Sequence, residues 1–145
     1  MEPQLLTVID KEDLKQWAPS EWPNWQFEAK HDGVRCLIVN GVPQSRTGKP
    51  LNNLGAVLKE IGQRANGAVL DGEIVGESWA DTMHNARASE GKRNEDALSF
   101  KVFDMLTIQE WKHQKCDRDL SDRQSLLWDY INPSAHVQLI AQILL

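Results

Sequence analysis

The sequence predicts a single domain of the α+β class. Strand-forming runs with turn signals between them occupy much of the chain, and the dipeptide Asn40-Gly41 is the clearest hairpin signal. Two other segments, 52–65 and 121–131, carry apolar residues at helical spacing. Because amphipathic helices of this kind bury one side against a sheet, we expect antiparallel strands flanked by helices.

Length and composition are those of an ordinary globular domain. A chain of 145 residues, 41% of them hydrophobic, can enclose a core of its own. No apolar run approaches the roughly 20 residues that span a bilayer, and the first four residues lack the basic side chains of a signal peptide. The two cysteines, Cys36 and Cys116, show no metal-ligand spacing. We therefore expect a reducing, cytoplasmic setting.

The charge distribution restricts where an anion could bind. A net charge of −5 argues against nucleic-acid binding through bulk electrostatics. The segment 28–49 is the exception, because its lysines and arginines outnumber its carboxylates. Any anion-binding face is expected within this segment.

The first third of the chain is predicted to be mainly extended. A short strand and a brief helix are expected within residues 1–24, before two prolines. Further strands are expected at 25–29, 34–40 and 42–46. Pro43 places the last of these at a sheet edge or a bulge.

The rest of the chain alternates between helical and extended patterns. We expect a helix over 52–65, capped by Asn52 or Asn53, and then two short strands in 68–75 that meet at Asp71-Gly72. The polar stretch 76–96 is expected to be a long surface excursion with one helical turn. The remaining predictions are a strand over 97–106, a helix over 121–131, and a strand or the start of a helix over 136–145.

One charged cluster interrupts the strand pattern near residue 30. The segment Lys30-His31-Asp32-Gly33-Val34-Arg35 lies between two strand-like runs, although Asp and Gly are poor strand formers and a half-buried lysine is costly. A lysine held in a concave site can reach its free-amine form and act as a nucleophile. The alternative interpretation is a solvated turn that joins two strands.

The cluster resembles motif I of the covalent nucleotidyltransferases, which comprise ATP-dependent DNA ligases, RNA ligases and mRNA capping enzymes. Three further elements follow in that family's order. They are Ser45-Arg46-Thr47-Gly48 (motif Ia), Asp71-Gly72-Glu73 (motif III) and Phe103-Asp104 (motif IIIa). The similarity covers roughly residues 25–106, with looser similarity to about 131, and it resembles most the small bacteriophage ATP-dependent DNA ligases.

The resemblance implies a role for each of five residues around a bound nucleotide. Lys30 would be the nucleophile that becomes adenylated. Glu28 would recognise the adenine amino group, and Phe103 would stack on the base. Arg35 would contact the 3′ side of the ribose. Glu73 would contact a ribose hydroxyl or a metal-bound water.

The resemblance also implies the cofactors and the nucleic-acid partner. Arg46 would hold a phosphate of AMP or of the nicked strand, and Lys49 would contact the DNA backbone. ATP would be the nucleotide, with Mg²⁺ or Mn²⁺ on its phosphates, and nicked double-stranded DNA would be the substrate. The setting would be a bacterial or phage-infected cytoplasm, with roles in DNA repair, replication and recombination.

The fold implied is the ATP-grasp-like nucleotidyltransferase domain, incomplete at the C-terminus. Neither motif IV, with its metal-site glutamate, nor motif V, with its two lysines, follows residue 106, and no OB-fold follows either. We therefore expect residues 1–145 to be a partial adenylation domain with weak or no ligation on its own. A truncated gene, a split gene with a complementing C-terminal ligase fragment, and a fragmentary record all fit this pattern.

Two functional alternatives remain beside an ATP-dependent DNA ligase, or its truncated remnant, that seals nicks through lysyl-AMP. One is an RNA ligase or a capping-type nucleotidyltransferase, although the Ser-Arg-Thr-Gly element favours a DNA ligase. The other is a non-catalytic binding remnant that keeps the fold without turnover.

Overall fold

The fold is built on one five-stranded sheet. The computed structural model describes residues 12, 15–16, 20, 28–90 and 92–140, and its strands stand in the order β2-β1-β3-β4-β5. The strands are β1 (Val34–Val39), β2 (Val42–Ser45), β3 (Ala68–Val75), β4 (Ser99–Thr107) and β5 (Val137–Leu139). Neighbouring strands pair antiparallel except β4 and β5, which are parallel. The predicted α+β class is confirmed, while the expectation of antiparallel strands is wrong for β5.

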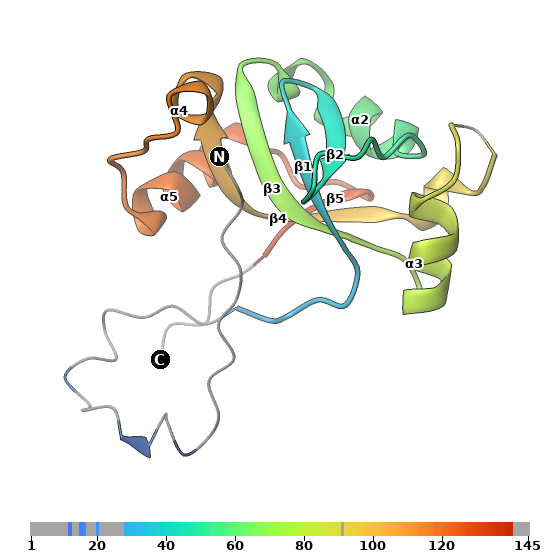
Figure 1. Ribbon diagram of the computed structural model, residues 1–145, viewed down its shortest axis with the longest axis horizontal. Coiled ribbons are helices and arrows are strands. Elements are labelled where there is room, and N and C mark those ends of the chain that lie inside the picture. The colour runs from blue at the N-terminus through green and yellow to red at the C-terminus, as the bar shows by residue number, and fades with distance from the viewer. Residues whose placement is uncertain (1–11, 13–14, 17–19, 21–27, 91, 141–145) are drawn as a thin grey trace.

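Helices flank the sheet at both of its ends. They are α2 (Gly55–Ile61), α3 (Trp79–Ala86), α4 (Ile108–His113) and α5 (Leu120–Tyr130), with short 3₁₀ helices η2 (Gly62–Ala65) and η3 (Glu95–Ala97). Figure 1 shows α4 and α5 at one end and α3 at the other. Among the described residues, none of these helices has the length and apolar character needed to cross a lipid bilayer.

The core lies between one face of the sheet and the helices α2 and α5. Alternate residues of the strands turn to that face, and the helices add an apolar stripe. Its fully buried members include Ile38, Leu70, Phe100, Val57 and Leu127. Because this face is filled by apolar side chains, polar groups on the central strands project from the opposite face.

The predicted hairpin at Asn40-Gly41 is confirmed. Both residues adopt positive φ, 49° and 83°, as the tight turn between β1 and β2 requires. The Asn40 side chain also accepts a hydrogen bond from the Gly67 backbone at 2.8 Å, which fixes the turn against the start of β3. Pro43 lies in β2 at the edge of the sheet, as predicted.

Residues 68–75 form one strand, so the prediction of two strands is wrong. β3 pairs with β1 on one side and with β4 on the other, and these two ladders keep its backbone continuous. The expected break is instead a β-bulge, in which Asp71 pairs with Asp104 but Gly72 pairs with Val102. Phe103 is the extra residue of β4, and a bulge of this kind redirects a side chain.

The predicted helix over 52–65 is shorter and capped differently. It begins at Gly55 and continues as η2 to Ala65. Its N-cap residue is Leu54, which has no capping side chain, and the Glu95 carboxylate accepts from the Gly55 backbone at 3.1 Å. The buried Asn53 side chain instead donates to the backbone oxygens of Asn85 and Arg93. The expected cap is therefore wrong, and this amide instead joins the segment before α2 to the end of α3 and to the loop that follows it.

One helix is longer than the sequence predicted, and another was not predicted. The stretch 76–96 contains the eight-residue helix α3, which Ser78 caps by accepting a hydrogen bond from the Asp81 backbone. Most described residues of this stretch are exposed, as predicted, but the helix is longer than one turn and Thr82 is fully buried. The six-residue α4 was not predicted, although Thr107 and Glu110 form a capping box at its start.

The predictions for the C-terminal third agree with the structure. The helix expected over 121–131 is α5, and the strand alternative for 136–145 is β5. The predictions for residues 1–27 lie largely outside the described residues, as do those for 141–145. Glu28 and Ala29 are described and are not in a strand, so the strand predicted over 25–29 is wrong at that end.

Candidate functional site

The polar face of the sheet carries three of the charged residues of the candidate site. Arg35 of β1 lies opposite Glu73 of β3, and Asp71 is two residues before Glu73. Side chains two apart on a strand share a face, so these three project together, away from the core that takes Cys36.

The segment that holds the predicted nucleophile passes directly beside β3. A Cβ on Gly33 would lie 2.0 Å from the carbonyl oxygen of Ile74, so only glycine allows this approach. Burial raises the pKa of Glu73, while the charges of Arg35 and Lys30 and a hydrogen bond from the Gly33 backbone act in the opposite direction. Lys30 is exposed, so the expectation that a concave site shields it from solvent is wrong, although its charge acts on Glu73.

Arg35 joins β1 to β3 and covers an aromatic ring. Its Nε and Nη2 donate to the two carboxylate oxygens of Asp71 at 2.5 and 2.7 Å. Its guanidinium carbon lies 4.5 Å from the centre of the Phe103 ring, which is a cation–π contact. The bulge in β4 directs Phe103 to this position.

Helix α5 contributes two consecutive residues to the same place. Arg123 donates from Nε and Nη2 to the two oxygens of Asp104 at 2.8 and 2.9 Å. The Nε2 group of Gln124 donates to Oε1 of Glu28 at 2.8 Å and to the backbone oxygen of Phe103 at 3.2 Å. Glu28 and Phe103, which are 75 positions apart, are thereby joined through one side chain.

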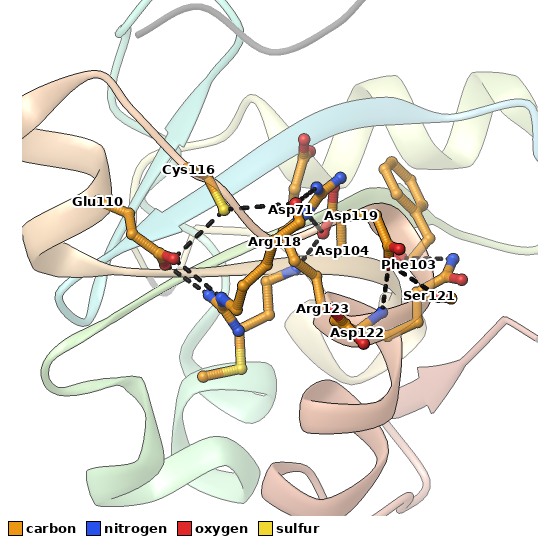
Figure 2. A network of polar contacts seen from close by, with 12 residues as sticks. Asp71, Phe103, Asp104, Glu110, Cys116, Arg118, Asp119, Ser121, Asp122 and Arg123 are labelled. Atoms are coloured by element: carbon orange, nitrogen blue, oxygen red, sulfur yellow. Dashed lines mark hydrogen bonds and ion pairs between the residues drawn. The ribbon is translucent and has the colours of Figure 1, made fainter.

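The polar network continues from the site towards α4. Figure 2 shows Asp71, Asp104, Arg123, Arg118 and Glu110 following one another across it. Nη1 of Arg123 donates to the Arg118 backbone oxygen at 2.9 Å, and Arg118 donates from Nε and Nη2 to Glu110 at 2.9 and 2.5 Å. Of the three arginine–carboxylate forks, one therefore joins β1 to β3, one joins α5 to β4, and one joins the α4–α5 connection to α4.

Burial makes two further carboxylates of the site harder to ionise. Burial raises the pKa of Glu28, helped by the negative charge of Asp104 and opposed by Gln124 and Arg35. Burial likewise raises the pKa of Asp71, although its fork with Arg35 acts to lower it. Neighbouring carboxylates with shifted pKa values are typical of ligand-binding and catalytic sites.

Arg46 and Lys49 lie at the sheet edge, outside this group. The turn 45–49 is closed by Ser45, whose backbone nitrogen donates to the Lys49 oxygen and whose hydroxyl contacts Thr47. Arg46 follows Ser45, the last residue of β2, which pairs with Cys36 of β1. Both Arg46 and Lys49 are exposed, and no hydrogen bond or ion pair within the described part of the chain joins them to the site.

The carboxylates present suit a cation held mainly by phosphates. Within residues 28–90 and 92–140, no three His, Cys, Asp or Glu side chains are placed to hold a metal ion together. Asp71 and Asp104 are each engaged by an arginine fork, and Glu28 accepts from Gln124. Among the described residues, no side chain donates a hydrogen bond to Glu73, so Glu73 is the carboxylate best placed to face such a cation. One carboxylate fits Mg²⁺, which commonly keeps waters and binds through substrate phosphates.

Four residues take part in the site without a role predicted from the sequence: Asp71, Asp104, Arg123 and Gln124. The carboxylate partners of Arg123 and Gln124 lie 19 and 96 positions away, so no local pattern reveals these pairs. One signal was available, because Gln124 is a polar residue on the apolar stripe of α5 that also carries Leu127.

The sequence itself matches no protein-family model and no curated protein. Solved structures do resemble the fold. A Lig E DNA ligase, from a study of DNA binding with a minimal scaffold, superposes with a TM-score of 0.66 at 15% identity, over 86% of this chain and 46% of that one. The fold is therefore one that solved DNA ligases contain.

Two viral ligases show the same likeness. The ATP-dependent DNA ligase from bacteriophage T7, in complex with ATP, gives a TM-score of 0.56 at 20% identity, over 80% of this chain and 47% of that one. The Chlorella virus DNA ligase-adenylate gives a TM-score of 0.61 at 22% identity, over 97% of this chain and 49% of that one. This chain therefore spans just under half of each of these three solved ligases.

Proposed function

We propose that this chain carries the adenylation site of an ATP-dependent DNA ligase, with Lys30 as the nucleophile. The observation that supports it most is the meeting of Glu28, Arg35, Glu73 and Phe103 on one face, with Lys30 within electrostatic reach of Glu73. The ligase fold and the ATP and adenylate states of two solved neighbours support the choice of nucleotide.

The proposed step is a phosphoryl transfer from ATP to the lysine. The free-amine lone pair of Lys30 forms a bond to the α-phosphorus, and the bond from that phosphorus to the oxygen of the β-phosphate breaks. Pyrophosphate leaves with the electron pair, and the amine proton passes to solvent. Because positioning and charge neutralisation carry most of the rate in such transfers, the surrounding residues act mainly by holding the nucleotide.

In this proposal, each neighbouring residue contacts a different part of the nucleotide. Phe103 stacks on adenine, and Glu28 accepts a hydrogen bond from its amino group. Arg35 contacts the 3′ side of the ribose, and Glu73 contacts a ribose hydroxyl or a water on Mg²⁺. When bound, Mg²⁺ supplies positive charge to the phosphate oxygens.

The exposed turn 45–49 is proposed to meet DNA. Arg46 would hold a phosphate and Lys49 the backbone of a nicked duplex, because surface cations bind phosphates with little sequence preference.

We further propose that residues 1–145 are a partial adenylation domain, completed by a C-terminal ligase fragment. Its test is to add a polypeptide with motifs IV and V to the chain and to measure sealing of a nicked duplex, which should appear only in the mixture.

Covalent labelling tests the nucleophile directly. The chain is incubated with Mg²⁺ and ATP or GTP labelled at the α-phosphate, beside the variants Lys30→Ala and Lys59→Ala. We expect acid-labile label from ATP on the wild type and on Lys59→Ala, whose lysine lies on the exposed side of α2, and none on Lys30→Ala.

Other outcomes select the alternatives. Label from GTP would indicate a capping-type enzyme. Label that persists in Lys30→Ala would contradict the choice of nucleophile. No label on any of the three proteins would favour a non-catalytic remnant of the fold.

A further inference from the structure

Gln124 is a buried amide at the centre of the site. Its side chain is on α5 and the residue is only 4% exposed. The two hydrogens of its Nε2 group are both used, one on the Glu28 carboxylate and one on the Phe103 backbone oxygen. It therefore connects the residue proposed to recognise the edge of the base with the residue proposed to stack on its face.

Packing alone does not explain a glutamine at this position. Its Oε1 atom is buried and has no hydrogen-bond partner among the described residues, which costs stability. An apolar side chain of the same size would avoid that cost and would continue the stripe formed by Leu127 and Ile131. What an apolar side chain would lose is the donor that faces Glu28.

The orientation of the amide is fixed by its partners. Glu28 and the Phe103 carbonyl are both acceptors, so the nitrogen of Gln124 must face them and the oxygen must face away. Oε1 of Glu28 is then engaged, and Oε2 accepts no hydrogen bond from the described residues. The negative charge of Asp104 and the positive charge of Arg35 act on Glu28 from β4 and β1, but neither is joined to its carboxylate by a hydrogen bond among the described residues.

We propose that Gln124 is the positioning residue that sets the purine preference of the site. By holding one oxygen of Glu28, it directs the other to the 6-amino group of adenine, which donates a hydrogen bond. Guanine carries a carbonyl oxygen at that position, which the carboxylate repels. This inference rests on the proposed function and adds to it the group that selects the base.

The experiment compares AMP with GMP as equilibrium ligands, and ATP with GTP as labelling substrates. Gln124→Met replaces the amide by an apolar side chain of similar size, and Gln124→Glu replaces the donor by an acceptor. Ser125→Met, at the next and exposed position of α5, is the matched control. Calorimetry gives the dissociation constants, labelling gives KM and kcat, and thermal unfolding reports the fold.

We expect Gln124→Met to bind AMP about tenfold to a hundredfold more weakly, the effect of losing a hydrogen bond to a charged group, with GMP binding unchanged. KM for ATP rises and kcat stays the same, because the base is remote from the reacting phosphate. Gln124→Glu loses the preference for AMP over GMP in the same way, and Ser125→Met keeps it. A merely structural role would weaken AMP and GMP equally and lower the unfolding temperature.

The results separate this inference from the proposed function. If the wild type prefers AMP but forms no covalent adenylate, the adenylation proposal is overturned and the inference is still measured by the AMP/GMP ratio. If Gln124→Met keeps the wild-type ratio, the inference alone is overturned. If the wild type binds neither nucleotide, both are overturned.

Discussion

At the scale of single residues, the site depends on the flat, forked shape of arginine. Arg35 pairs with both oxygens of Asp71, and its plane lies over Phe103. It also acts to lower the pKa of Glu73. A lysine carries the same charge but has neither the fork nor the flat face, so it could not make these contacts together.

Arg35→Lys is therefore expected to be damaging although it conserves charge. One oxygen of the half-buried Asp71 would lose its donor, and we expect the free energy of unfolding to fall by about 1–3 kcal/mol. The ordering of Phe103 is lost as well, so labelling by ATP should fall. Chemical denaturation and the labelling assay measure the two effects.

The control for this change is Arg64→Lys, because Arg64 is an exposed residue of η2. It should leave both stability and labelling as in the wild type. If Arg35→Lys and Arg64→Lys had the same stability and the same labelling, the fork of Arg35 would contribute to neither property.

At the scale of elements, local signals predicted the hairpin and α5 well, but not features that need a partner. The hairpin follows from Asn40-Gly41, which itself favours the turn. The bulge that turns Phe103 needs the β3–β4 register, which no short stretch encodes. The capping box of α4 was in the sequence as Thr107-x-x-Glu110 and could have been predicted.

In the candidate site, too, residues in local motifs were predicted and pairs between distant segments were not. Lys30, Glu28, Arg35, Glu73 and Phe103 were predicted because each lies in a short motif whose spacing is visible in the chain. The forks of Arg118 and Arg123 and the amide of Gln124 were not predicted, because they complete pairs across helix and sheet. Pairing between distant segments is the information that the fold adds.

The connection between α4 and α5 is expected to depend on one carboxylate. Glu110 caps α4 and receives the fork of Arg118, which lowers its pKa to about 2. A depressed carboxyl pKa stabilises the fold above the ordinary value near 4.5, and this contribution is lost as the pH falls towards 2. Glu110→Gln should lower the free energy of unfolding by about 1–2 kcal/mol at pH 7, because it removes a charged partner of Arg118.

Denaturation of the wild type and of Glu110→Gln over pH 2–7 measures this dependence. The difference between the two proteins should be full at neutral pH and should shrink below pH 4.5. Glu90→Gln, at an exposed loop position, serves as the control and should follow the wild type. A difference independent of pH would mean that Glu110 acts by shape rather than by charge.

At the scale of the whole molecule, the parallel strand β5 pairs with β4, and the residues just before it contact α2. Glu60 of α2 accepts hydrogen bonds from the backbone and Nδ1 of His136 at 2.8 and 2.7 Å, and from the Ser134 hydroxyl. Nε2 of His136 faces the Asp96 oxygen at 3.2 Å. Both ring nitrogens face acceptors, so the imidazole is best satisfied when it is protonated.

This contact should give the fold a stability window in pH. The hydrogen bond to Glu60 raises the pKa of His136 above 6.5, and Ser134 and His136 lower the pKa of Glu60 to about 2. The histidine contribution is complete below pH 6.5 and is lost as the pH rises through its raised pKa. The glutamate contribution is complete above pH 4.5 and is lost as the pH falls. The charged pair therefore acts fully between about pH 4.5 and 6.5.

We expect Glu60→Gln to lower the unfolding temperature most within that window, and less on either side of it. Hydrogen exchange should show where the effect arises, because the Phe100 amide donates to the His136 oxygen and the Ile140 amide to the Val102 oxygen. In Glu60→Gln these two amides should exchange faster at pH 6, while the Leu58 amide inside α2 should not. Equal protection of all three amides would show that β5 is held by its strand pairing alone.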